Sequence, residues 1–129
     1  FEIRNDMSLE DLKNSLGEDV LTSMYEYLIP EEDDEMEGFV PAYGKKDVKT
    51  CEEILLEFID ALSRADENKE IIMGQVKETV LALNVLNEKC EYELIETDQR
   101  EDICKFIITA VNVAGLKTDE DVTEEWREW

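Results

Sequence analysis

Paired carboxylates are the residues of this chain that could most directly carry out a reaction. Two pairs are spaced three residues apart, Glu67 with Glu70 and Glu88 with Glu91. Each pair would share one face of a helix. Helical, magnesium-dependent nucleotide pyrophosphohydrolases use such pairs, because Mg²⁺ bridges carboxylates to the phosphates of the substrate. No evident set of Lys or Arg could hold a phosphate, and 35 acids in 129 residues make chance pairs common. This enzyme class therefore stays open as the weaker alternative.

Other patterns of reactive or metal-binding residues match less well. Residues 66–70 begin like a calcium-binding loop, but Ile71 and Lys77 occupy the positions of its turn glycine and its last glutamate. Residues 16–20 are similar to the acyl-carrier motif, yet Val20 stands where the carrier needs a serine for its prosthetic group. The chain has no His, the residue most used in acid–base catalysis and transition-metal binding. We therefore expect no catalytic residue, no metal and no cofactor.

The cysteines and the apolar segments indicate the cellular compartment in which we expect this chain. Cys51, Cys90 and Cys104 are odd in number and widely spaced, unlike a disulfide framework or a zinc site. We expect buried or half-buried thiols in a reducing compartment. No apolar stretch approaches the length that spans a bilayer, and no secretory leader is visible. Residues 1–6, ahead of Met7, could be a remnant of an expression vector or a flexible N-terminus. The expected location is the cytoplasm.

The charge balance narrows the choice of partners. Lys and Arg number 13 against 35 Asp and Glu, which gives a net charge of −22. Phosphates and anionic lipids both need cationic contacts, so we expect neither a nucleic-acid nor a membrane partner. Excess negative charge instead speeds the encounter with a basic protein. Many basic proteins are enzymes that act on nucleic acids, and a rigid acidic domain could occupy the groove of one as a decoy.

Helical periodicity runs through most of the chain. Apolar residues recur every three or four positions, the spacing of one helix face, within residues 9–28, 54–65, 72–86, 103–114 and 122–129. Gly17 would divide the first of these segments into two helices, since glycine is unfavourable in a helix interior. Strand-like alternation and hairpin dipeptides are absent from the sequence. We predict an all-α fold, a compact bundle of five or six helices forming a single domain over residues 1–129.

Local signals predict where the helices begin and end. The expected starts are Thr50, in a Thr50-x-x-Glu53 capping box, the polar break at 66–70, Thr97 or Asp98, and Thr118. Gly115 is expected to end a helix in the left-handed conformation. Pro30 ends the first segment, and six carboxylates follow within residues 31–37. We therefore predict a long acidic loop over residues 30–49, and loops of this length are commonly functional.

Four stretches in the second half of the chain are similar in sequence to one group of proteins. They are LNEKC (86–90), LIETDQREDI (94–103), AGL (114–116) and DVTEEWREW (121–129). From about Thr50 onward the chain resembles bacterial immunity proteins, which are encoded beside contact-dependent growth-inhibition or other polymorphic toxins. The resemblance implies a non-catalytic cytoplasmic protein that binds and neutralises one cognate toxin domain. It transfers no interface residues, because such families bind through variable surfaces.

The general properties of protein interfaces then indicate which residues of this chain would contact the toxin domain. A few aromatic or charged side chains usually supply most of the binding energy. The expected partner-binding residues are Asp33, Asp34, Glu35, Phe39 and Tyr43 in the predicted loop, and Glu91, Tyr92 and Glu93 in a predicted connector. For Phe39 and Tyr43, anchoring of the loop to the core is an equal alternative, whereas Trp126 and Trp129 are expected to pack on the bundle. The alternative function is an acidic interaction module or nucleic-acid mimic unrelated to toxins.

Overall fold

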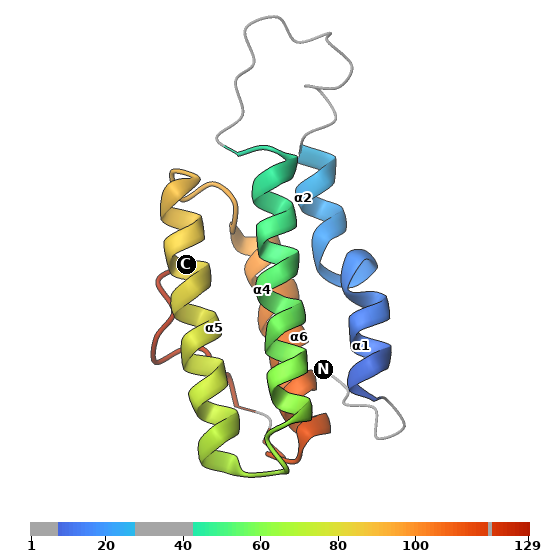
Figure 1. Ribbon diagram of the computed structural model, residues 1–129. Helices are drawn as coiled ribbons and strands as arrows, with labels where there is room; N and C mark the ends of the chain where they lie inside the picture. The colour runs from blue at the N-terminus through green and yellow to red at the C-terminus, as the bar shows by residue number, and fades with distance from the viewer. Residues whose placement is uncertain (1–7, 28–42, 119) are drawn as a thin grey trace, which may run out of the picture.

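The computed structural model describes residues 8–27, 43–118 and 120–129 (Figure 1). Within these ranges the regular elements are all helices, so the predicted all-α class is confirmed. They are α1 (Leu9–Leu16), the π-helical segment η1 (Gly17–Leu21), α2 (Thr22–Tyr27), α4 (Lys45–Ser63), α5 (Lys69–Lys89) and α6 (Thr97–Ala114). Because α1, η1 and α2 follow one another directly, the described residues form four helical rods. The expected count of five or six helices is not confirmed.

The first rod contains a π-helical turn where the sequence predicts a break. Gly17 has an ordinary helical φ of −58°, so the helix continues through it. The buried residues of this rod include Leu12, Leu16, Val20 and Met24, a repeat of four. In an uninterrupted α-helix with 3.6 residues per turn, a repeat of four drifts around the axis. A π turn holds more residues, because its hydrogen bonds span five positions. The π turn therefore keeps these side chains facing the core.

Helix α4 begins five residues before the start predicted at Thr50. Its first turn is closed by Asp47, whose Oδ2 accepts a hydrogen bond from the Gly44 backbone N–H at 3.0 Å. Thr50 lies inside the helix, and its hydroxyl donates to the Lys46 carbonyl oxygen at 3.0 Å. The predicted loop over 30–49 is therefore wrong for Lys45–Lys49, which are helical. Its residues 30–42, with the acidic run, lie outside the described residues.

The starts of α5 and α6 lie close to the predicted positions. Asn68, within the predicted polar break, caps α5 by accepting a hydrogen bond from the Ile71 N–H at 3.1 Å. The cap of α6 is Glu96, one residue before the expected Thr97. The Glu96 N–H donates to Gln99 Oε1 at 3.1 Å, and Gln99 Nε2 donates to the Ser23 hydroxyl on α2 at 3.1 Å. One side chain thus completes the first turn of α6 and ties it to the first rod.

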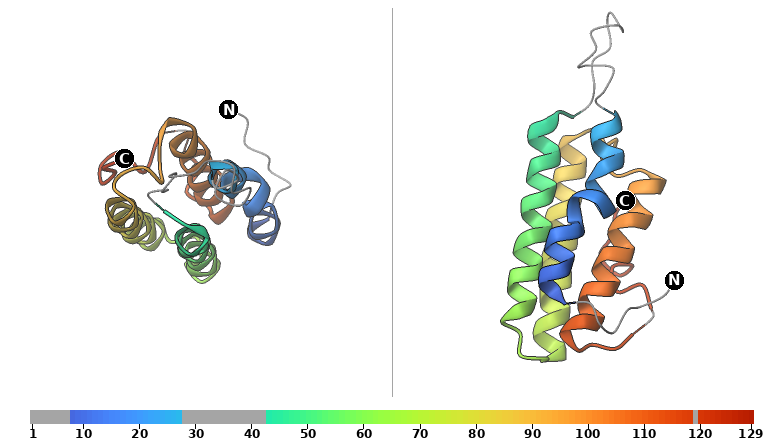
Figure 2. Two further views of the ribbon diagram at one scale, coloured as in Figure 1. Left: turned by 90° about the horizontal axis from the view of Figure 1, so that it is seen from above. Right: turned by 90° about the vertical axis from the view of Figure 1, so that its right-hand side faces the viewer.

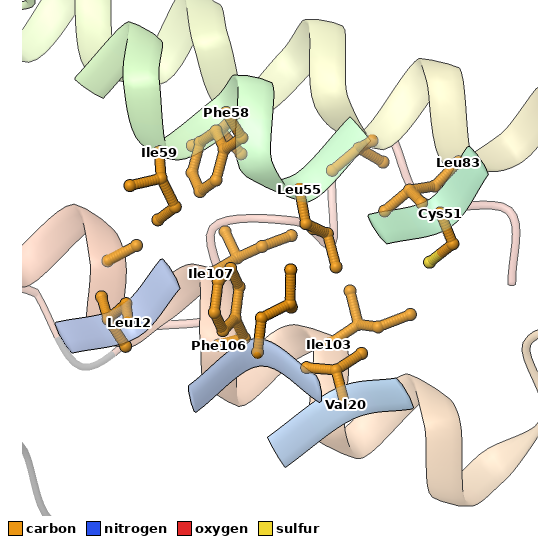
Figure 3. Close-up of a cluster of buried hydrophobic side chains, with 14 of the residues drawn as sticks. Leu12, Val20, Cys51, Leu55, Phe58, Ile59, Leu83, Ile103, Phe106 and Ile107 are labelled. Carbon is orange, nitrogen blue, oxygen red and sulfur yellow. The ribbon is translucent and has the colours of Figure 1, made fainter. Parts of the chain in front are cut away.

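Side chains from all four rods meet in one hydrophobic core, shown in part in Figure 3. α4 and α6 each pack against every other rod, whereas α5, among the described helices, contacts only α4 and α6. α5 therefore forms one edge of the bundle, and the first rod lies at the opposite edge (Figure 2). Burial of each large apolar side chain contributes roughly 1.5–3 kcal/mol. The labelled core residues are Leu12, Val20, Cys51, Leu55, Phe58, Ile59, Leu83, Ile103, Phe106 and Ile107.

After α6 the chain returns along α5 without a further helix in residues 115–118 and 120–129, so the start predicted at Thr118 is wrong. Those residues form turns that are held in place by Asn84 of α5. Asn84 Nδ2 donates to the Trp126 carbonyl oxygen at 2.8 Å, and Asn84 Oδ1 accepts from the Glu128 N–H at 3.1 Å. Trp126 and Trp129 are half-buried against the core, as expected.

Gly115 ends α6 in the left-handed conformation predicted for it. Its φ is +117°, and the Leu116 N–H donates to the Val111 carbonyl oxygen at 2.9 Å, which closes the last turn. A β-carbon at this position would lie 3.1 Å from Glu67 Cγ and 3.2 Å from Glu67 Cβ, both in the turn between α4 and α5. Glycine is therefore required here by both the backbone conformation and the available space.

We expect Gly115→Ala to lower the free energy of unfolding by about 1–3 kcal/mol, because alanine strains the backbone and crowds Glu67. Urea unfolding followed by circular dichroism measures the change. Gly17→Ala is the matched control, since no heavy atom lies within 4 Å of the position that its β-carbon would take and its φ is helical. The control should gain about 0.5–1 kcal/mol. Equal effects of the two substitutions would contradict this account of Gly115.

Candidate functional site

The turn between α5 and α6 presents an aromatic ring between two carboxylates. Glu91, Tyr92 and Glu93 are all exposed, and 61% of the surface of Tyr92 is accessible. Glu91 and Tyr92 have φ values of +57° and +64°, a conformation that costs about 1–2 kcal/mol per residue for an L-amino acid. The turn between α4 and α5 shows the same backbone at Asp66 and Glu67, but it carries no aromatic residue. The exposed ring therefore distinguishes the turn between α5 and α6 from the turn between α4 and α5.

Buried neighbours hold this turn in its conformation. The Asn87 side chain is 2% exposed, and its Oδ1 accepts a hydrogen bond from the Ile95 N–H at 2.9 Å. The Asn87 carbonyl oxygen accepts a second hydrogen bond, from the Tyr92 N–H at 2.8 Å. Cys90 and Leu94, on either side of the exposed residues, are fully buried. Tyr92 is therefore fixed to the bundle before any partner arrives, which lowers the entropic cost of binding.

A second group of carboxylates lies where the start of α6 meets the first rod. Burial raises the pKa of Asp102, and the negative charges of Asp98, Glu101 and Asp19 raise it further, while Lys105 partly opposes them. We call Asp19, Asp98, Glu101 and Asp102 the Asp102 cluster. Asp98 stands in the first turn of α6, where the helix dipole favours an acid. The raised pKa of Asp102 nevertheless shows that repulsion and desolvation outweigh attraction at that carboxyl.

Of the other predicted contact residues, Tyr43 lies within the described part of the chain, and it is not at this surface. Tyr43 is only 4% exposed, and its hydroxyl is 3.5 Å from the Met24 carbonyl oxygen to which it donates. It therefore anchors the chain at the start of α4, the alternative that the sequence left open for it. Asp33, Asp34, Glu35 and Phe39 lie outside the described residues. Of the eight predicted residues, the structure gathers three, Glu91, Tyr92 and Glu93, in one exposed turn.

The Asp102 cluster could not be found from the sequence. Its members come from η1 and from the first two turns of α6, far apart in the chain, and their proximity depends on the packing of these elements. The only local signal is the run Asp98-x-x-Glu101-Asp102, which places three acids within two turns of a helix. In a chain with 35 acids that signal has little weight by itself.

The described residues offer little for a bound metal or a covalent reaction. No three acidic or cysteine side chains among them are grouped so as to hold a metal ion. Burial raises the pKa of the Cys51 thiol to about 12 and of the Cys90 thiol to about 11, so both stay protonated and unreactive at neutral pH. Cys104 is half-buried, 3.4 Å from the Thr123 hydroxyl, and burial also raises its pKa. The expected burial of the thiols is confirmed.

A shallow groove between α4 and α5, with a volume of about 120 Å³, is lined by Ile54, Glu57, Phe58, Gln75, Glu78, Thr79 and Ala82. Small-molecule sites usually enclose several hundred Å³. No helix in the described ranges is both long enough and apolar enough to span a bilayer. The acidic surfaces named above, the Glu91–Glu93 turn and the Asp102 cluster, are the candidate contacts among the described residues.

Comparison with protein-family models, with curated proteins and with solved structures finds no match to this chain.

We expect Asn87→Ala to lower the free energy of unfolding by about 1–3 kcal/mol, because the buried Ile95 N–H loses its acceptor. Asn14→Ala, at an exposed position of α1, is the matched control and should change stability by less than about 0.5 kcal/mol. Urea unfolding measures both variants, and hydrogen exchange of the Ile95 amide reports the turn directly. Unchanged protection of that amide would contradict the role assigned to Asn87.

We expect Asp102→Asn to raise the free energy of unfolding at pH 7 by up to about 1 kcal/mol. The pKa of Asp102 is higher in the folded chain than in the unfolded one, so ionisation of this carboxyl costs folded-state stability as pH rises through that interval. The advantage of the variant should therefore be present at neutral pH and disappear as pH falls below about 3.9, the ordinary pKa of Asp. Urea unfolding against pH measures it. Glu53→Gln on α4 serves as control, and an equal gain there would refute the account.

Proposed function

We propose that this chain is a non-catalytic immunity protein that binds and neutralises a cognate toxin domain with a basic surface. The Asp102 cluster and the exposed Glu91–Glu93 turn form the contact. The resemblance of the second half of the chain to immunity proteins suggests the biological role, and the arrangement of charges supplies the physical support. The protein acts in the cytoplasm, where the toxin would reach its target, and needs no cofactor.

The observation that carries the proposal is the gathering of carboxylates from η1 and α6 in the Asp102 cluster. Burial and like charges both raise the pKa of the Asp102 carboxyl, so the free protein carries an electrostatic cost at the cluster. A cationic side chain placed beside the cluster would remove part of that cost. The gain on binding therefore includes repulsion relieved within the protein as well as attraction between partners. Such complementarity raises the association rate and suppresses binding of acidic proteins.

Tyr92 supplies the second element of the contact. Tyrosine is enriched among the residues that dominate interface energies, since it combines a large apolar ring with a hydroxyl. The backbone that carries the ring is held by the buried residues on both sides of the turn, so little backbone freedom remains to be lost. Glu91 and Glu93 flank the ring and extend the negative surface that a basic partner would meet.

The test uses the toxin domain encoded by a reading frame adjacent to that of this chain. Inducible expression of that domain should arrest growth, and co-expression of this chain should restore it. Binding kinetics of the two purified proteins should show an association rate that falls steeply with salt. Failure to restore growth, together with no measurable binding, would overturn the proposal. Binding of many unrelated basic proteins with equal affinity would instead favour a general acidic interaction module.

Two variants locate the contact. Removing two charges by Asp98→Asn with Asp102→Asn should slow association about threefold to tenfold and flatten its salt dependence, with little change in dissociation. Tyr92→Ala should speed dissociation by about tenfold or more. Glu53→Gln with Glu57→Gln, two exposed acids on α4, is the control with the same change of net charge. Equal slowing by the control would show that only total charge matters and would remove the Asp102 cluster from the mechanism.

A further inference from the structure

The groove between α4 and α5 gathers polar side chains that bind no other described residue. The two helices lie side by side (Figure 1). The polar side chains that line the groove are Glu57, Gln75, Glu78 and Thr79, and the apolar ones are Ile54, Phe58 and Ala82. No hydrogen bond or ion pair joins any of the four polar side chains to another residue in the described part of the chain. Their donors and acceptors are therefore left for solvent or for a ligand.

Thr79 is the residue that most clearly indicates a ligand. Only 6% of its surface is exposed, yet its hydroxyl has no hydrogen-bond partner among the described residues. Trp129 Nε1 is the one side-chain polar atom of those residues that is both sealed from solvent and without a partner. The Thr79 hydroxyl must therefore open onto the groove that Thr79 lines. Because buried polar groups are normally paired, a hydroxyl left unpaired in the wall of a groove is available to a ligand.

Two carboxylates give the groove a negative charge. Glu57 comes from α4 and Glu78 from α5. The positions three and four residues away from each of them on its own helix hold no Lys or Arg, so no helix neighbour neutralises either charge. No three acidic or cysteine side chains of the described residues are grouped to hold a metal ion, and one wall of the groove is apolar. These features favour an organic cation.

The size and the chemistry of the groove select the kind of cation. Its volume is about 120 Å³, and an engineered protein cavity of about 150 Å³ holds benzene, so a small planar group fits. A guanidinium has five N–H donors in one plane, enough for both carboxylates and the Thr79 hydroxyl, whereas an ammonium has three. Its weakly hydrated faces suit the apolar wall. We infer that the groove between α4 and α5 binds the guanidinium end of an alkylguanidinium.

The groove lies away from the Asp102 cluster of the proposed toxin contact. The cluster is built from η1 and α6, and the first rod lies at the opposite edge of the bundle from α5 (Figure 2). Glu57 and Glu78 therefore take no part in the contact with the toxin. The guanidinium site does not depend on the proposed function, since its test needs only the purified chain.

Agmatine and putrescine test for the guanidinium, because the two cations share one carbon chain and one net charge and differ only at one end. Each is titrated into the isotope-labelled chain at constant ionic strength and followed by amide NMR. Agmatine should shift the amides of residues 54–58 and 75–82 saturably, with a dissociation constant on the order of 1 mM, and putrescine should bind at least about fivefold more weakly. Equal binding of the two, or no saturable shift up to about 20 mM agmatine, would overturn the proposal.

A second pair of probes identifies the source of the guanidinium. Arginine and lysine blocked at both ends by acetyl and methylamide groups present the same two cations as a protein carries them. We expect the blocked arginine to bind more tightly than the blocked lysine. Tighter binding of agmatine than of blocked arginine supports a free small molecule as the ligand, and the reverse order supports an arginine side chain of a protein.

Thr79→Val removes the hydroxyl and keeps the shape of the side chain, so it should weaken agmatine binding about threefold to tenfold. Thr109→Val on α6 is the matched control, because Thr109 is 8% exposed and does not line the groove. The control should bind agmatine like the parent chain. Thermal unfolding of both variants checks that they fold. Equal affinities of the two variants would refute the role of Thr79.

Glu78→Gln removes one of the two carboxylates and should weaken agmatine binding about tenfold. Glu88→Gln is the matched control, because it makes the same change of net charge at another exposed position of α5 that does not line the groove. Its effect should stay within about twofold. If both variants weaken binding equally, agmatine is attracted only by total charge, and the site between α4 and α5 is refuted.

Discussion

A continuous apolar core must offset the repulsion among 22 excess negative charges, and the rest of the structure follows from that constraint. The core runs through all four rods and is centred on α4 and α6, which each contact every other rod. The excess charge is distributed unevenly over the surface: α5 sums to zero, whereas the short stretch 91–96 carries three acids and no base. The fold thus separates the apolar core that stabilises it from the surface regions that carry its excess charge.

The helical class could be predicted because apolar spacing is a property of each segment alone. The same holds for the cap within 66–70 and for Gly115, where one residue type satisfies one local backbone requirement. Predictions failed where two local signals competed. Thr50 fits a capping box by pattern, yet Asp47 closes an earlier first turn, which begins at Gly44. The apolar residues after Thr118 have helical spacing, but Asn84 of α5 binds that segment as a series of turns.

The candidate site likewise has one part that the local sequence predicts and another part that depends on long-range packing. The Glu91–Glu93 connector could be located from the sequence, because an aromatic residue between two acids interrupts the helical pattern there. The way its backbone is held could not be predicted, because it depends on Asn87, whose side chain and carbonyl oxygen both accept hydrogen bonds from the turn. The Asp102 cluster depends on contacts between η1 and α6, which no local pattern reports. Long-range packing, rather than residue type, decides which of the many acids in this chain lie together.

The π turn of η1 makes the length of the first rod as important as its composition. A repeat of four residues from Leu12 to Met24 stays in phase with the core only because the helix is locally widened at Gly17–Leu21. Loss of a single residue there would leave an ordinary α-helix in which Met24 keeps its face, because eleven steps of about 100° bring it back to within about 20° of Leu12. Relatives whose first rod is an ordinary α-helix should consequently align with this chain through a gap of one residue between Leu16 and Met24.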